Sequence, residues 1–281
     1  MSSSKKLIIN ADDYGLCREV NRAVEMLALD SAADGVPRLG GVSVLASGEC
    51  WEQAADFLGS HPWLSAGAHL NAVEGRPVST APEIGILLGN DGCFAGLKTL
   101  LPRWLMSPLA VPRAVEIEWR AQVERLLRAG VKLFHADSHQ HLHAFPPAYR
   151  IAVRLCREYH IPALRRPVER HQYPERRASL IALRASWTLA RAGAGTATLR
   201  HNDHFLGFTR AGAYERGALA EDIRRLSEGL TEIALHPSII NGAPYPHYFG
   251  RNELSALLNE WLPAEIARLG IELTTWEQAT Q

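Results

Sequence analysis

Short runs of β-branched and other apolar residues alternate along this chain with longer segments of helical spacing, and this alternation constrains the fold most strongly. The expected strands cover 6–10, 41–47, 64–71, 131–137, 162–165, 231–237 and 271–276, and the expected helices cover 18–30, 50–58, 112–130, 148–160, 178–193 and 253–270. Repeated strand–helix units predict an α/β protein with a mainly parallel sheet. A TIM-like barrel of about seven or eight units fits the length. An open doubly wound sheet is the alternative, although no GxGxxG motif follows the first strand.

We expect a single domain, 1–281, because no internal repeat and no low-complexity linker divides the chain. Two stretches interrupt the alternation, Gly75–Pro112 and Pro237–Arg251, and both are rich in proline and glycine. Long loops in a compact domain are often functional. Both stretches follow strands that end in histidine, so we expect functional loops at the carboxyl-terminal face of the sheet.

The charge and cysteine content exclude several classes of protein. The formal net charge is zero, which argues against nucleic acid or an anionic membrane as a partner bound through bulk charge. The N-terminus lacks the features of a signal peptide, and no apolar run is long enough for an integral membrane segment. The four cysteines are scattered without a CxxC pair, as expected of reduced thiols in a cytoplasmic protein.

Polar residues follow several of the expected strands, at the end where α/β proteins place their active sites. The first strand runs into Asp12 and Asp13, two adjacent carboxylates that repel each other unless a positive group lies beside them. The third strand ends in His69, and a late strand ends in His236. The fourth strand leads into a segment with five candidates, His135, Asp137, His139, His141 and His143. We expect these groups to lie close together at one opening, at the carboxyl-terminal end of the sheet.

Two histidines and one carboxylate suit a divalent ion such as Zn²⁺, Mn²⁺ or Fe²⁺ with positions left open for water. A second carboxylate that does not bind the ion can accept a proton from that water. One of the adjacent acids would then bind the ion and the other would face the water. Simpler interpretations exist for each part: Asp12-Asp13 as a turn and helix cap, and His69 as a core residue. For 139–143, alternate residues of a strand share one face, which favours a clustered site.

Four motifs, "LIINADDYGL", "GAHLNAVEGRPV", "DSHQHLHAFP" and "ALHPS", resemble those of the YdjC-like carbohydrate deacetylases, the ChbG/HpnK group. They occur in the family's order, and the resemblance runs from about Leu7 to Leu257. It implies a modified (β/α) barrel and removal of the N-acetyl group from an acetylated amino sugar. It also implies one divalent metal ion, Mg²⁺ or Zn²⁺ with Mn²⁺ or Co²⁺ as alternatives, and a homodimer.

The resemblance also implies roles for individual residues. Asp13, His69 and His139 would bind the metal, Asp12 would be the general base and His236 the general acid. The family's arginine after the fifth strand falls on Arg165 or Arg166. The expected substrate contacts are Arg165, His141, Tyr245 and Tyr248. Independently of the resemblance, the aromatic and polar loop residues Trp104, Tyr245, His247, Tyr248 and Phe249 are candidates for stacking on a sugar ring, with ordinary loop packing as the alternative.

Some positions depart from the family pattern. The sequence has Gly40-Gly41-Val42-Ser43 where a hydroxyl pair is usual, and Ala68 and Ala72 replace larger apolar residues. These departures concern the substrate, which the sequence leaves open between chito-oligosaccharides, another N-acetylated amino sugar and a glycolipid such as an N-acetylglucosaminyl hopanoid. A non-haem iron oxygenase shares the two-histidine, one-carboxylate donor set. A non-catalytic sugar-binding protein is the third class that we consider.

Overall fold

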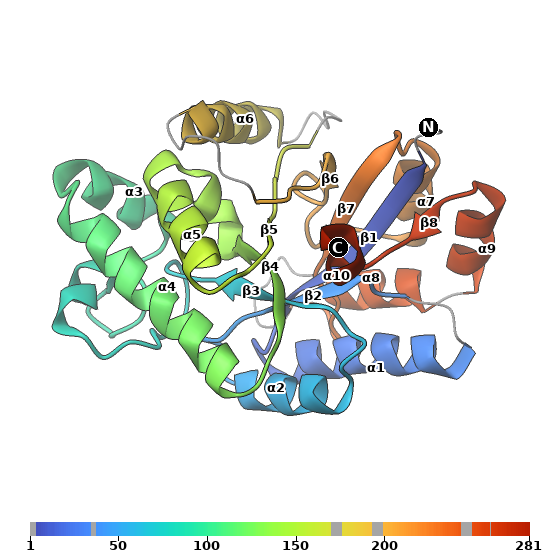
Figure 1. The fold of residues 1–281 in the computed structure, drawn as a ribbon, viewed down its shortest axis with the longest axis horizontal. Coiled ribbons are helices and arrows are strands. Elements are labelled where there is room, and N and C mark those ends of the chain that lie inside the picture. The colour runs from blue at the N-terminus through green and yellow to red at the C-terminus, as the bar shows by residue number, and fades with distance from the viewer. Residues whose placement is uncertain (1–3, 35–37, 170–175, 193–198, 243–248, 259) are drawn as a thin grey trace.

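The computed structural model describes residues 4–34, 38–169, 176–192, 199–242, 249–258 and 260–281. Its strands form one sheet in the order β5-β4-β3-β2-β1-β7-β6, with β8 paired to the start of β1 (Figure 1). All pairings between these strands are parallel. The strands are β1 (Lys5–Tyr14), β2 (Gly41–Val44), β3 (Ala66–Leu70), β4 (Leu133–Ser138), β5 (Ala163–Leu164), β6 (His204–Leu206), β7 (Gly229–Leu235) and β8 (Glu272–Leu273).

Helices surround the sheet, as Figure 1 shows, with α1 and α2 along one side, α3 to α6 along another and α7 to α9 along a third. They are α1 (Arg18–Asp34), α2 (Trp51–Ser60), α3 (Leu97–Met106), α4 (Ala110–Arg128), α5 (Pro146–Glu158), α6 (Arg177–Ala192), α7 (Arg216–Arg224), α8 (Gly250–Leu257), α9 (Trp261–Arg268) and α10 (Trp276–Thr280), with 3₁₀ turns η1 (Pro82–Leu87) and η2 (His139–Ala144). Isolated parallel bridges at Ala163–Arg200 and Glu169–Phe205 link the two sides of the curved sheet. The TIM-like α/β layout expected from the sequence is confirmed in this partly closed form.

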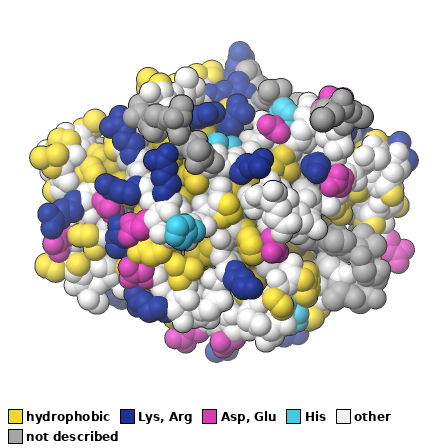
Figure 2. Space-filling model, viewed as in Figure 1, with side chains coloured by type: hydrophobic (Ala, Val, Ile, Leu, Met, Phe, Trp, Pro, Cys, Tyr) yellow, Lys and Arg dark blue, Asp and Glu magenta, His cyan; other side chains and the backbone are white. Residues whose placement is uncertain are grey.

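The centre of the sheet is apolar. Leu7, Ile8 and Ile9 of β1 are fully buried, as expected for a strand covered on both faces of a parallel sheet. No helix in the described part of the chain is long and apolar enough to cross a membrane. On the face drawn in Figure 2, acidic and basic side chains are interspersed with apolar ones.

Several elements differ from the sequence prediction. Gly75–Pro112 was expected to be a loop but contains η1, α3 and the start of α4. Leu100 and Trp104 of α3 are buried at helical spacing, so Trp104 packs in the core and does not serve the predicted sugar contact. The loop was expected because the whole stretch is rich in proline and glycine. The single helix expected at 253–270 is two helices, α8 and α9, because Pro263 is tolerated in the first turn of α9 but would break a continuous helix.

Three further elements, β6, α7 and α10, were not predicted. The segment 139–143 was interpreted as a continuation of a strand, but β4 ends at Ser138 and η2 follows. Gln140 and His141 have positive φ values of 51° and 54°, so alternate residues of this segment do not share a strand face. The strand argument for this histidine cluster is therefore wrong.

Candidate metal centre and active site

The predicted acids and histidines lie at one end of the sheet. Asp12 and Asp13 are near the end of β1, His69 is near the end of β3, and His139 and His236 directly follow β4 and β7. Because these strands are parallel, their carboxyl ends open to the same side. A cavity of about 390 Å³ lies there, and Asp12, His69, His139 and His236 all line it. The structure therefore brings these side chains together where the strand ends predicted.

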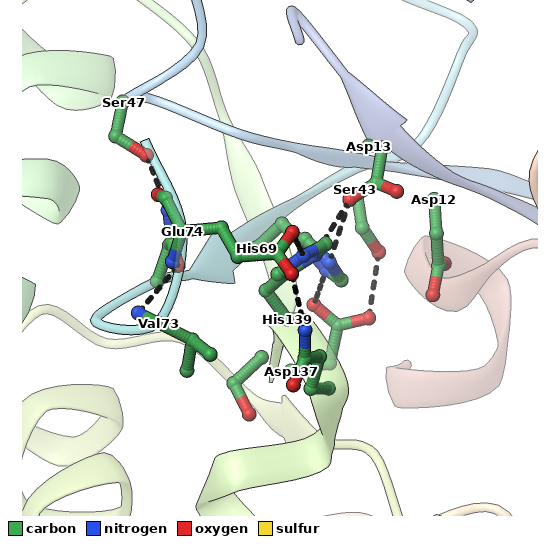
Figure 3. A network of polar contacts seen from close by, with 12 residues as sticks. Asp12, Asp13, Ser43, Ser47, His69, Val73, Glu74, Asp137 and His139 are labelled. Carbon is green, nitrogen blue, oxygen red and sulfur yellow. Dashed lines mark hydrogen bonds and ion pairs between the residues drawn. The ribbon is translucent and has the colours of Figure 1, made fainter. Parts of the chain in front are cut away.

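Asp13, His69 and His139 form a compact, buried group that could hold a metal ion, with one possible ligand atom from each within 4.8 Å of the others. Oδ1 of Asp13 lies 3.2 Å from Nε2 of His69 and 2.9 Å from Nδ1 of His139. Figure 3 shows the three side chains turned toward one another, with Asp12 beside them. One carboxylate and two imidazoles are a donor set that fits a divalent transition-metal ion with open coordination positions.

The charges in this group favour a cation between the ligands. Burial alone would raise the pKa of Asp13, but His139 and His69 hold it well below its usual value. Burial alone would lower the pKa of His139, but Asp13 and Glu74 raise it to about 9. The pKa of His69 is also raised well above its usual value, by Asp137 and Asp13 and against the effect of burial. A metal ion would take the place of the protons that these imidazoles hold.

The backbone of β1 explains how two adjacent acids reach one site. Neighbouring residues of a regular strand point to opposite faces. Asp13, however, has a φ of 61°, in the left-handed region, and the register between β1 and β2 shifts between Ala11 and Tyr14. Such a conformation costs a residue with a side chain about 1–3 kcal/mol, and strained residues of this kind cluster at functional sites. It places the carboxylate of Asp13 between the histidines while Asp12 lines the cavity.

Asp12 has the positive neighbour that the sequence led us to expect. Arg165 donates two hydrogen bonds to the Asp12 carboxylate, at 2.6 Å and 2.7 Å, and Asn10 donates a third at 2.8 Å. The same buried guanidinium pairs with Asp137 and with Glu232. Burial raises the pKa of Glu232 to about 7, although Arg165 acts in the opposite direction. One arginine thus fixes three buried carboxylates beneath the cavity.

This arrangement corrects the predicted role of Arg165. Its side chain is fully buried and does not line the cavity, so it does not make the predicted substrate contact in this structure. It orients Asp12 instead. Arg166, the other candidate, lies farther out and donates through its guanidinium to the backbone carbonyl of Asp203.

The remaining predicted contacts have different outcomes. His141 lines the cavity, and its ring centroid lies 5.5 Å from that of Phe205 and 5.7 Å from that of Phe208. His143 lies below the surface, where its ring contacts the hydroxyl of Ser138 and the backbone carbonyl of Arg165. Tyr245, His247 and Tyr248 lie outside the described residues.

Other residues around the site had no role assigned to them from the sequence. Glu74 lines the cavity and contacts Nε2 of His139 at 3.0 Å. Asp137, which was only a candidate by position, contacts Nδ1 of His69 at 2.7 Å and accepts a hydrogen bond from Ser43. Arg176, Ser179 and Phe208 form part of the cavity wall. Glu74 follows closely after the strand that carries His69, and Asp137 lies near the end of β4, so position gives a usable signal for both. Arg176, Ser179 and Phe208 gave no such signal.

Fold and site together define an α/β barrel-like protein with a buried Asp–His–His group suited to a divalent cation. The chain belongs to the YdjC-like protein family, whose sequence profile matches residues 6–268. It is 35% identical over 158 residues to a carbohydrate deacetylase of Brevibacillus brevis, an alignment that spans 56% of this chain and 58% of that protein. This match thus covers little more than half of the relative's length.

Two relatives match over most of their length. A carbohydrate deacetylase of Geobacillus stearothermophilus is 28% identical over 96% of both chains. The human carbohydrate deacetylase is 28% identical over 95% of this chain and 89% of its own. The crystal structure of a protein from Enterococcus faecalis V583 superposes with a TM-score of 0.75 at 22% identity, over 99% of this chain and 100% of that one. This last similarity shows that the fold is shared.

Proposed function

We propose that this protein is a metal-dependent carbohydrate deacetylase that hydrolyses the N-acetyl group of an acetylated amino sugar and releases acetate. The observation that carries the proposal is the buried Asp13–His69–His139 group with Asp12 beside it in one cavity. The relatives named carbohydrate deacetylase support it. Mg²⁺ or Zn²⁺ is the proposed ion, with Mn²⁺ or Co²⁺ as alternatives.

Asp13, His69 and His139 would hold the ion. When bound, a divalent cation supplies Lewis acidity toward water and toward the acetyl carbonyl. Asp12 accepts the proton of the attacking water as the new C–O bond forms. Its carboxylate is already oriented, because Arg165 and Asn10 hold it in place. Asp12 therefore needs no rearrangement to act as the general base.

His236 would protonate the leaving nitrogen as the C–N bond breaks, so that the products are acetate and a free amino sugar. Its side chain lines the cavity, and its backbone N–H donates to the buried carboxylate of Glu253. Glu253 also accepts from the backbone N–H of Tyr214. Helix α8 thus fixes the segment that presents His236.

Substitution of the two proton-transfer groups tests this mechanism. Asp12→Asn and His236→Ala should each lower the rate of acetate release by about 10²–10⁴-fold, the usual contribution of a positioned acid or base. Acetate release from N-acetylglucosamine oligomers in the presence of added metal is the measurement. His160→Asn, which changes an exposed histidine outside the cavity, is the control. Full activity of Asp12→Asn would refute the assignment of the base.

The substrate is an N-acetylated sugar in this proposal, and assays on chito-oligosaccharides, other N-acetyl sugars and an N-acetylated glycolipid would separate the three candidates. His141 and Phe208 offer ring surfaces in the cavity wall for a sugar. Metal-dependent consumption of oxygen would favour the oxygenase, and metal-free sugar binding that Asp12→Asn and Asp13→Asn leave unchanged would favour the binding protein. The homodimer and the cytoplasmic location remain predictions.

A further inference from the structure

Each histidine of the candidate metal site has its second ring nitrogen held by a carboxylate. Nδ1 of His69 lies 2.7 Å from Oδ1 of Asp137, and Nε2 of His139 lies 3.0 Å from Oε2 of Glu74. Asp137 belongs to β4, whereas Glu74 belongs to the loop after β3. Carboxylates in such positions orient metal-binding histidines and raise their basicity. No role for Glu74 follows from the sequence motifs interpreted above.

The backbone of the Glu74 loop is fixed by buried side chains. Asn71 accepts hydrogen bonds from the backbone N–H groups of Val73 and Glu74 and donates to the carbonyl of Glu74 at 2.7 Å. Gln122 of α4 bonds to both backbone groups of Asn71, at 2.8 Å and 2.7 Å. Figure 3 shows Glu74 reaching from this loop toward His139. The loop is therefore attached to the core independently of the Glu74 carboxylate.

The other oxygen of Glu74 fixes the segment that follows His139. Oε1 accepts a hydrogen bond of 2.7 Å from the side chain of Gln140. Gln140 is in the left-handed region, which is unfavourable for a residue with a side chain, so this turn needs contacts that hold it. Glu74 thus contacts both the ring of His139 and the turn that carries it.

The geometry distinguishes the two nitrogens of His139. Nδ1 faces Asp13 at 2.9 Å, on the side of the metal group, and Nε2 faces Glu74 at 3.0 Å. A nitrogen that binds a metal must be free of its proton, so the proton of a neutral imidazole then lies on the other nitrogen. A carboxylate at Nε2 favours that tautomer, since it accepts from N–H.

We propose that Glu74 is a positioning residue that holds His139 in the Nε2–H tautomer, with Nδ1 presented to the metal, and thereby sets the affinity of the site. The inference rests on the metal site of the proposed function. Glu74 does not itself need to touch the ion or the substrate for this role.

Calorimetric titration of metal-free protein with Zn²⁺ tests the effect on affinity. Glu74→Ala should weaken binding by about 10–100-fold, the usual effect of losing such a partner. Glu74→Gln keeps an acceptor oxygen and should retain most of the affinity. Gln140→Ala is the comparison variant: it removes the hydrogen bond between Glu74 and the turn but leaves the contact of Glu74 with His139, so it should weaken Zn²⁺ binding much less than Glu74→Ala does.

Long-range ¹H–¹⁵N spectra of the Zn²⁺-loaded protein give a readout that loop packing alone would not change. His139 should carry its proton on Nε2 in the unmodified protein, and Glu74→Ala should weaken or mix that signature. If Glu74→Ala left both the affinity for Zn²⁺ and the tautomer of His139 unchanged, the inference about Glu74 would be wrong, while the proposed metal site would stand. Failure of the unmodified protein to bind Zn²⁺, Mg²⁺, Mn²⁺ or Co²⁺ would overturn the proposed metal site and this inference with it.

Discussion

At the scale of single residues, each of the two adjacent acids, Asp12 and Asp13, contacts a different set of positive groups. Asp13 lies between the imidazoles of His69 and His139, and Asp12 is bound by the guanidinium of Arg165. Burying these charges is costly, and mutual pairing offsets that cost only where the geometry is good. Arg165 meets this condition through its planar, bidentate contact with Asp12.

Arg165 provides a direct test of this electrostatic arrangement. Arg165→Met should lower the free energy of unfolding by about 3–5 kcal/mol, because it leaves buried carboxylates without a cation. Arg165→Lys keeps the charge but not the fork of donors, so it should lose less stability and still lower the rate of acetate release. Urea denaturation at neutral pH measures the first effect.

The control for this experiment is Arg128→Met, which removes an exposed i,i+4 ion pair with Glu124 and should change stability by at most about 1 kcal/mol. Equal losses in Arg165→Met and Arg128→Met would contradict the account of Arg165 as the cation of the buried cluster.

The donor types of the metal group could be predicted from the sequence, because Asp13 and His69 lie at strand ends of recognisable strands. The buried charged residues that surround those donors could not be predicted in the same way. Arg165 was expected to contact the substrate from the family resemblance alone, and nothing in the sequence indicated that this charged residue is fully buried. Glu232 lies between Thr231 and Ile233 in β7, and only the folded structure shows that its carboxylate faces Arg165.

At the scale of elements, the packing of β3 against β4 depends on a glycine. A Cβ added to Gly67 would lie 2.3–2.4 Å from ring atoms of His135, which is too close for any side chain. The ring of His135 is in turn stacked on Trp276 of α10, at a centroid distance of 4.9 Å. Gly67 therefore makes room for the layer that joins β4 to the last helix.

Gly67→Ala should destabilise the protein by about 1–3 kcal/mol or more, because the rigid, stacked ring of His135 cannot move aside easily. Gly59→Ala in α2 is the matched control, since nothing lies within 4 Å of the added Cβ and alanine favours a helix. Thermal or urea unfolding compares the two. A Gly67→Ala protein as stable as Gly59→Ala would show that this layer is not tightly packed.

The elements also show which sequence signals were sufficient. The amphipathic pattern of α4 was predicted because it repeats over many residues, and β1 was predicted from its short apolar run, Leu7 to Ile9. The three residues of β6 are too few to produce a period, and they pair only with segments outside this run, namely β7 and, through Phe205, Glu169. Helix α3 was missed although its apolar spacing is present, because the proline and glycine content of the whole stretch Gly75–Pro112 favoured a loop.

At the scale of the whole molecule, one end of the barrel-like sheet is structural and the other carries the candidate site. At the amino ends of the strands, β8 pairs with β1 at Lys6–Glu272, and α10 packs against β4 through Trp276. The carboxyl ends carry the cavity and the Asp–His–His group. This separation between a structural face and a reactive face is typical of β/α barrels. It allows the strained conformation of Asp13 to be held by a stable frame.

The most direct test of the central claim is acetate release from N-acetylglucosamine oligomers and related N-acetyl sugars by protein stripped of metal and then resupplied with Mg²⁺, Mn²⁺, Zn²⁺ or Co²⁺. We predict that stripped protein releases no acetate, that at least one ion restores release, and that Asp13→Ala cannot be restored. Acetate release that is unaffected by removal of the metal, or by Asp13→Ala, would contradict the account.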